Sequence, residues 1–213
     1  MMMSCKLMAA AGVAALALGF AASASAGTTV LYDNGPVNLN DNAEAIDSGF
    51  EAANSFTLSK ASVVTGMTFA VYLSNPNYSL TSVDWGISTS PFADDGTAIL
   101  PVETYNPILG TASLAIGPVR LAAGTYWITL SNATQAAGNA GPIFWYESGG
   151  PSSAVEAYDG TVLGYPEAPG ASDSFQILGT AVPEPATWAM LILGLGMVGF
   201  AARRRSQRLT VVA

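Results

Sequence analysis

The stretch MTFAVYL (residues 67–73) alternates two kinds of side chain along its length. Every odd-numbered position, from Met67 to Leu73, is large and apolar, whereas the even-numbered positions carry threonine, alanine and tyrosine. Successive side chains of a β-strand point to opposite faces of a sheet, so an alternation of period two predicts a strand with one buried face. We therefore expect residues 67–73 to form a strand that covers a hydrophobic core.

The same alternation recurs along the chain, in SVDWGIS (82–88), TYWITL (125–130) and SFQIL (174–178). Shorter runs rich in β-branched and aromatic residues are also typical of strands. These further candidate strands are Thr28–Tyr32, Ser55–Leu58, Ala98–Val102, Ile108–Ile116, Ile143–Glu147 and Val155–Tyr158.

Clusters of Asn, Asp, Gly and Pro separate these runs, as at Asp33-Asn34-Gly35 and Gly117-Pro118, and predict turns there. Only DNAEAIDSGFEAAN (residues 41–54) departs from the strand pattern, and we expect one helical turn in it. Roughly ten short strands with frequent turns indicate an all-β fold. The prediction is an antiparallel, jelly-roll-like β-sandwich over residues 27–182, without an internal domain boundary.

The composition of residues 27–182 excludes several classes of function for the predicted domain. This portion holds all but one of the 15 acidic residues of the chain but only two bases, Lys60 and Arg120, so it would repel a phosphate backbone and we expect no nucleic-acid partner. The chain has no histidine, and its only cysteine, Cys5, lies near the N-terminus. Residues 27–182 therefore lack the usual general base, a thiol nucleophile and the usual zinc ligands. We expect no catalytic residues, no cofactor and no metal site, with acid–glycine turns at 93–96 and 158–161 as an alternative place for Ca²⁺.

The first 26 residues have the three parts of a secretory signal peptide. Lys6 gives a positive start, residues 7–22 form an apolar run, and Ala24-Ser25-Ala26 follows. A signal peptidase reads small residues at the positions of Ala24 and Ala26, so we expect cleavage before Gly27. An uncleaved N-terminal membrane anchor is the alternative.

Near the C-terminus, residues 186–202 form an uncharged run of 17 residues. At about 1.5 Å of rise per residue, a helix of this length spans roughly 25 Å, the lower limit for the hydrocarbon core of a bilayer. Trp188 lies at the outer end of the run, where an indole favours the membrane interface. We expect a single transmembrane helix over these residues.

A cluster of arginines, Arg203, Arg204 and Arg205, directly follows the apolar run. By the positive-inside rule it stops transfer and holds residues 203–213 in the cytoplasm. The domain at 27–182 would then lie outside, as a periplasmic domain of a precursor held at the inner membrane. A permanent anchor and a removable one are both compatible with this topology.

The segment that combines these features reads PEPATWAMLILGLGMVGFAARRR (residues 183–205). Pro183-Glu184-Pro185 comes first, then Trp188-Ala189, then the apolar run and the arginines. This order and spacing resemble the PEP-CTERM sorting signal in its PEPxxWA variety. The resemblance implies that an exosortase, a membrane processing enzyme of Gram-negative bacteria, cleaves the chain near the PEP motif. It also implies delivery to the cell surface or to an exopolysaccharide matrix.

The domain itself offers three functional hypotheses. The first is a non-enzymatic surface or matrix protein associated with exopolysaccharide or biofilm. The second is a carbohydrate-binding module, in which Trp127 and Trp145 stack on sugar rings, with Tyr146, Tyr158 and Tyr165 as further candidates. The third is a hydrolase that uses two carboxylates.

Overall fold

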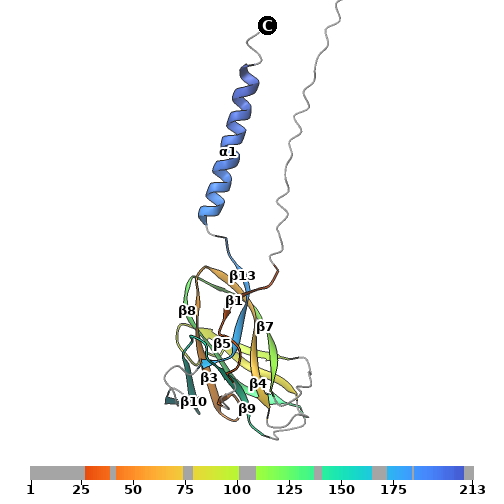
Figure 1. Cartoon of the computed structure of the whole chain (residues 1–213), viewed down its shortest axis with the longest axis vertical. Coiled ribbons are helices and arrows are strands. Elements are labelled where there is room, and N and C mark those ends of the chain that lie inside the picture. Colours follow the sequence, from red (N-terminus) through yellow and green to blue (C-terminus); the bar gives the residue numbers. More distant parts are fainter. Residues whose placement is uncertain are drawn as a thin grey trace, which may run out of the picture.

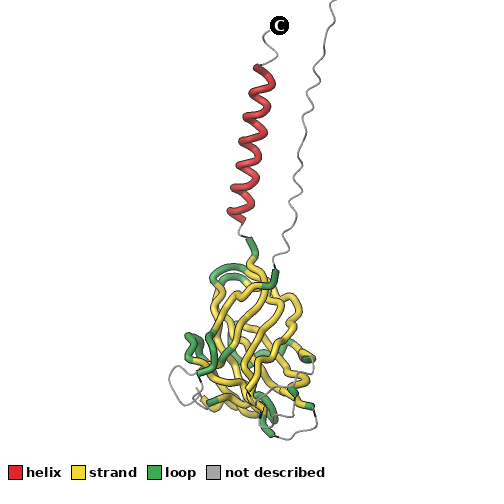
Figure 2. The backbone as a smooth tube through the Cα atoms, turned by 45° about the vertical axis from the view of Figure 1, so that its right-hand side comes forward, coloured by secondary structure: helices red, strands yellow, loops and turns green. Residues whose placement is uncertain are grey.

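The computed structural model describes residues 27–38, 42–73, 79–100, 109–136, 141–164, 172–183 and 185–208. Strands dominate these residues, and a single helix stands at the C-terminal side (Figure 2). The strands form two sheets in which every pairing is antiparallel. The predicted all-β class is therefore confirmed.

The first sheet has seven strands, with β4 (Ser62–Leu73) at its centre. Along one edge, β4 pairs with β7, and along the other it pairs first with β13 and then with β9. β1 and β12 end the main path, and β2 pairs with β9. The bounds are β1 (Thr29–Asp33), β2 (Ala43–Ala45), β7 (Leu109–Leu121), β9 (Ile143–Ser148), β12 (Ser172–Asp173) and β13 (Phe175–Ala181).

The second sheet has six strands in the order β11-β10-β3-β8-β5-β6. From β6 to β10 the chain changes sheet at every step, so consecutive strands belong to opposite sheets. The jelly-roll-like connectivity itself stays a prediction. The bounds are β3 (Phe50–Leu58), β5 (Leu80–Ser88), β6 (Gly96–Ile99), β8 (Gly124–Gln135), β10 (Ala154–Tyr158) and β11 (Thr161–Gly164).

The core lies between the two sheets and follows the alternation that the sequence predicted. In β4 the side chains from Met67 to Leu73 at odd-numbered positions are all at most 1% exposed. Trp145 packs edge-on against Phe69 and Phe175, with ring centroids 6.0 and 5.5 Å apart. Large apolar side chains from both sheets thus close one continuous core.

Two local predictions are wrong. Gly117-Pro118 makes no turn: it lies inside β7, at a register shift opposite the Val64–Gly66 segment of β4. A bulge in an edge strand tolerates proline, which has no N–H to donate. Residues 41–54 hold no helical turn in the described part either, because residues 43–45 form β2 and residue 50 begins β3. The tight turn between these strands has positive φ at Ser48 (55°) and Gly49 (92°).

Helix α1 (Pro185–Arg208) follows β13 and extends away from the sandwich (Figure 1). Proline suits its first position, where a helix needs no N–H donor. Its large apolar side chains, from Trp188 to Phe200, are between 52% and 70% exposed. Among the described residues no helix meets the length and apolar character needed to cross a membrane. The transmembrane helix expected at 186–202 is therefore not confirmed.

Both ends of the domain leave the sandwich at the same pole. β1 and β13 are antiparallel neighbours, with Thr29 opposite Gly179, so the start of one strand lies beside the end of the other. We call this end of the sandwich the proximal pole, because α1 extends from it (Figure 1). The opposite end is the distal pole.

Candidate functional site

The proposed cleavage segment lies between a paired strand and a helix. The Val182 N–H donates to the Ala61 carbonyl at 2.7 Å, so pairing with the sandwich continues up to this residue. Pro183 is exposed, and Pro185 begins α1. Because proline cannot extend the ladder, Pro183 ends the pairing of β13. Glu184 lies outside the described residues.

The other predicted sorting residues are exposed where the structure describes them. Trp188 is 56% exposed, Ala189 is exposed, and both lie in the first turns of α1. Arg203 and Arg204 are exposed near its end, and the Arg204 guanidinium lies 4.9 Å from the centroid of the Phe200 ring. The side chain of Arg205 is outside the described part. Ala24 and Ala26 also lie outside it, and Gly27, the predicted new terminus, is exposed two residues before β1.

The structure separates the two tryptophans that were expected to bind sugars. Trp127 lies half-buried on β8, with Ser55 and Ser88 as its cross-strand neighbours, and it keeps part of its indole accessible. Trp145 has no exposed surface, and its Nε1–H donates to the Ser174 carbonyl at 3.1 Å. A sugar ring has no access to Trp145 in this arrangement, which corrects that prediction. The alternation of β9 turns Trp145 inward and its neighbour Phe144 outward.

Phe144 forms part of a cavity on the outer face of the first sheet, which we call the aromatic hollow. One part, of about 550 Å³, is walled by β2, β9, β10 and the turn before β3. An adjoining part, of about 290 Å³, shares Ala43 and Phe144 with the first. The two parts are lined by Ala43, Ala45, Asp47, Ser48, Phe50, Tyr72, Gly141, Pro142, Phe144, Tyr146 and Glu156.

The strand register explains the shape of the aromatic hollow. Tyr72 pairs with Phe144 across β4 and β9, and their ring centroids are 5.9 Å apart. On the other edge of β9, Ala45 pairs with Phe144. Large rings thus stand beside a methyl group on the same face of the sheet, and this difference in size leaves a depression. Phe50 contributes a further ring, which packs at a tilt of 47° against Tyr158, with the ring centroids 4.6 Å apart.

Two carboxyl groups border the aromatic hollow. Asp47 is held in place, because its Oδ1 accepts from the Ile143 N–H at 3.2 Å and its Oδ2 from the Ser48 hydroxyl at 3.2 Å. Glu156 Oε1 accepts from the Ala45 N–H at 3.2 Å. Burial raises the pKa of Glu156 above its ordinary value, and the Ala45 hydrogen bond partly opposes this shift.

A group of polar side chains links the two sheets in the interior. We call it the buried polar cluster, and its members are Asn34, Glu44, Asn54, Ser148, Ser152, Ser172 and Asp173. Asn34 is fully buried, and its Nδ2 lies within hydrogen-bond distance of the hydroxyls of Ser148, Ser152 and Ser172 and of the Asp173 carbonyl, at 2.6 to 3.2 Å. Asn54 reaches Asp173 from the opposite sheet, donating to Oδ2 at 2.5 Å and accepting from the Asp173 N–H at 2.9 Å. The cluster therefore serves as an internal cross-link, closed off from solvent.

Within the buried polar cluster, Glu44 and Asp173 form an acid pair without a base. Burial raises the pKa of Asp173 well above its ordinary value of 3.8, and the neighbouring Glu44 carboxyl raises it further. Burial likewise raises the pKa of Glu44 above its ordinary 4.5. When both are ionised, Glu44 Oε2 and Asp173 Oδ1 have no hydrogen-bond donor among the described residues. A proton shared between the two carboxyls would satisfy both oxygens.

The described part of the chain contains no group of three or more acidic, cysteine or histidine side chains arranged to hold a metal ion. In the acid–glycine segment at 93–96, one carboxylate is used to hold the segment onto β5: Asp95 Oδ2 accepts from the Ile87 N–H at 2.7 Å. Calcium at this turn stays a hypothesis without a supporting ligand cluster.

The geometry defines a β-sandwich followed by an exposed proline-rich junction and an apolar helix. Residues 181–205 match the PEP-CTERM protein-sorting motif. The chain therefore carries this motif at its C-terminus, as the sequence predicted, and the motif indicates an exported protein that an exosortase-type enzyme processes. No match to the chain was found among curated proteins.

The sequence did not point to the aromatic hollow or to the buried polar cluster. The sequence marks Tyr146 only by its aromatic ring, and it does not distinguish Phe144, Phe50 and Tyr72 as site residues. The only local signal is the pair of alanines, Ala43 and Ala45, in the stretch 41–54 for which the sequence predicts one helical turn. Asn34 and Asp173 are 139 residues apart, and only the fold brings them together.

Proposed function

We propose that this chain is a non-enzymatic exported protein of a Gram-negative cell surface or extracellular matrix. A signal peptide ending at Ala26 starts its export, and an exosortase removes the C-terminal segment near Pro183–Pro185. The match of residues 181–205 to the sorting motif is the observation that carries this proposal. The mature product associates with exopolysaccharide or biofilm.

The arrangement of the core supports removal of the C-terminal segment. All core residues and the apolar side chains packed against them lie between Leu31 and Ile177. Among the described residues, Val182 makes the last backbone hydrogen bond to the sandwich. Cleavage after this point would remove α1 without taking away any part of the core.

We further propose that α1 enters the inner membrane before processing, with Arg203–Arg205 on the cytoplasmic side. A helix whose apolar side chains are exposed on all sides favours an apolar environment over water. The uncharged run of 17 residues is short for a bilayer, and local thinning or a protein partner would accommodate it. A permanent anchor is the alternative to removal.

Mass spectrometry of the two termini of the native protein tests the proposal. We expect the mature chain to begin at Gly27 and to end near the PEP motif. A matched variant with Pro183, Glu184 and Pro185 all replaced by alanine should keep α1 and stay in the membrane fraction. A mature wild-type chain that still carries Arg203–Arg205 would reject processing and leave the permanent anchor.

A further inference from the structure

We infer that the aromatic hollow binds a saccharide whose pyranose rings carry no negative charge. This inference rests on the proposed function only for the place where the protein would meet its ligand. It places the ligand on a different surface from Trp127 and Trp145, the two tryptophans that the sequence suggests for sugar binding.

The shape of the aromatic hollow suits a small ligand in a shallow groove. Its larger part, at about 550 Å³, lies within the range of roughly 300–1,000 Å³ that is usual for ligand sites. The smaller part continues it across the Phe144 ring. Two adjoining cavities that share Ala43 and Phe144 suit consecutive rings of an oligosaccharide better than a single compact molecule.

The rings supply the apolar contacts that a sugar needs. A pyranose presents flat C–H faces, which pack on aromatic faces, and hydroxyls at its rim, which need hydrogen-bond partners. Phe144 and Tyr72 lie side by side on the outer face of the sheet and are only half-buried. Phe50 is also half-buried, on the opposite wall. Rings of this kind contribute contact area at low entropic cost, because they have few rotatable bonds.

The charges bordering the aromatic hollow select against anionic ligands. Asp47 and Glu156 line it, and no lysine or arginine does. The two bases of the sandwich, Lys60 and Arg120, lie near the proximal pole, since Ser62 pairs with Ala181 and Arg120 pairs with Val63. Carboxylates accept hydrogen bonds from sugar hydroxyls and attract an amino group, but they repel uronates and phosphates.

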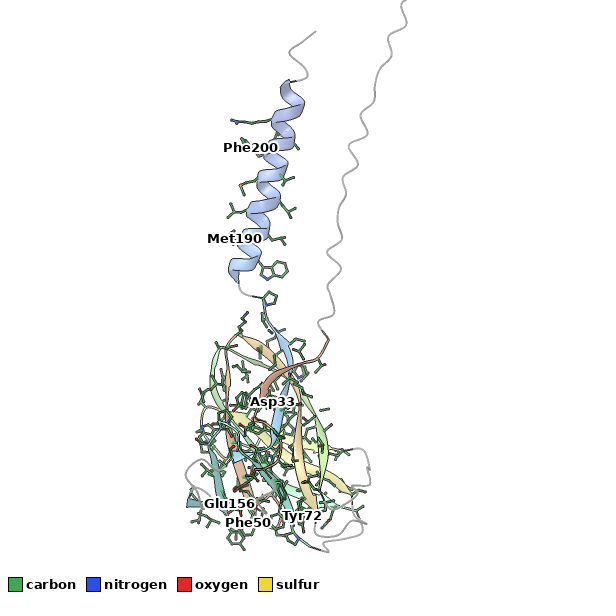
Figure 3. All side chains as sticks on the ribbon, viewed as in Figure 1. Asp33, Phe50, Tyr72, Glu156, Met190 and Phe200 are labelled. Carbon is green, nitrogen blue, oxygen red and sulfur yellow. The ribbon has the colours of Figure 1, made fainter. Side chains whose placement is uncertain are left out.

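The position of the aromatic hollow makes it accessible in an anchored precursor as well as in a released domain. Figure 3 shows Phe50, Tyr72 and Glu156 grouped at the distal pole, the end of the sandwich farthest from α1. The start of β1 and the end of β13, to which the two targeting segments are joined in sequence, both lie at the proximal pole. A ligand in the surrounding matrix therefore meets the aromatic hollow without obstruction by the membrane-directed end.

The test measures binding of soluble oligosaccharides to the full chain, purified in a detergent that contains no sugar. The probes are neutral gluco-, manno- and galacto-oligosaccharides, a chitosan hexamer and an oligogalacturonate, each titrated by calorimetry. We expect at least one neutral or amino probe to bind and the oligogalacturonate not to bind. Phe144→Leu, which removes the flat ring but keeps apolar volume, should weaken binding roughly three- to tenfold.

Two further variants make the result decisive. Glu156→Gln keeps the size of the side chain but removes its charge, and it should also weaken binding severalfold. Near-ultraviolet circular dichroism shows whether each variant is folded. Trp127→Ala is the matched control on the other sheet and should leave affinity unchanged. Loss of binding in Trp127→Ala but not in Phe144→Leu overturns the inference, and so does binding of the anionic probe alone.

Two other outcomes also overturn it. One is the absence of binding to every probe. The other is a concentration-dependent dimer that Phe144→Leu abolishes, since this would make the aromatic hollow an interface between two copies. These measurements use purified protein, so they do not depend on processing in cells. A failure of the sorting proposal would appear only in the mass spectra of the native termini.

Discussion

At the scale of single residues, the acid pair of Glu44 and Asp173 is the least expected feature of the interior. Both carboxyls are at most 3% exposed, and a third acid, Glu147, lies close enough to raise the pKa of each by repulsion. Isolated charges are costly to bury, so such a pair holds a proton more tightly in the folded state than in the unfolded state. The buried polar cluster thus makes folding depend on pH.

The sign of this dependence follows from the raised pKa values. Between the ordinary pKa values of 3.8 and 4.5 and the raised values, the folded chain binds more protons than the unfolded chain. The free energy of unfolding therefore falls as the pH rises through this range. We expect the domain to be more stable at pH 5 than at pH 8, as measured by urea denaturation at both values.

Replacement of Glu44 by Gln should reduce this pH dependence. The amide adds a donor for Asp173 Oδ1 and removes one buried charge, so unfolding at pH 8 should cost about 1–2 kcal/mol more than in the wild type. Asp94→Asn, which removes an exposed acid, is the control and should change little. A variant Glu44→Gln that is less stable than the wild type at pH 8 would contradict the account of the acid pair.

At the scale of elements, Gly86 shows how a loop is fixed onto a strand. The segment at residues 92–95 crosses β5, where the Asp95 N–H donates to the Trp85 carbonyl at 2.8 Å. The Phe92 N–H donates to the Thr129 hydroxyl at 3.0 Å. A Cβ on Gly86 would come within 1.9 Å of the Ala93 carbonyl oxygen. Only glycine allows this close approach of two backbones.

The substitution Gly86→Ala should therefore displace the crossing segment. We expect a loss of about 1–3 kcal/mol in the free energy of unfolding, typical of overpacking. Gly117→Ala is the matched control, because no atom lies within 4 Å of the added Cβ in the bulge of β7. Thermal unfolding followed by circular dichroism compares the two. Equal thermal unfolding midpoints for the two variants would show that the segment at residues 92–95 can move aside without a loss of stability.

At the scale of the whole molecule, the sandwich and α1 are separate in packing. Every core residue precedes the sorting motif, and α1 continues beyond the proximal pole without covering a sheet (Figure 1). The described core and most of the sorting motif thus lie in different parts of the chain. This separation explains how a short C-terminal motif can follow an unrelated domain.

A chain that ends at Pro183 should keep the fold of the full protein. Its thermal unfolding midpoint should lie within about 2 °C of that of the full chain, because no core contact is lost. A second truncation, after Gln176, removes most of β13 and should prevent folding, since β13 pairs with both β1 and β4. Unfolding of the chain ending at Pro183 would show that α1 contributes to the fold.

The sequence by itself determined the features that are encoded locally. Alternation within seven residues is enough to identify β4, because the two faces of a strand differ at each step. The sorting segment is likewise contiguous, because its prolines, apolar run and arginines follow one another in the sequence. The all-β class and the motif at residues 181–205 therefore follow from short stretches.

Only the tertiary structure decided which residues meet. The aromatic hollow exists because β2 and β4 pair with opposite edges of β9 in one register, and a shift by one residue would turn Phe144 inward and Trp145 outward. The buried polar cluster joins Asn34 to Asp173 across 139 residues. Long-range register depends on the packing of all strands at once, so no single stretch of sequence contains it.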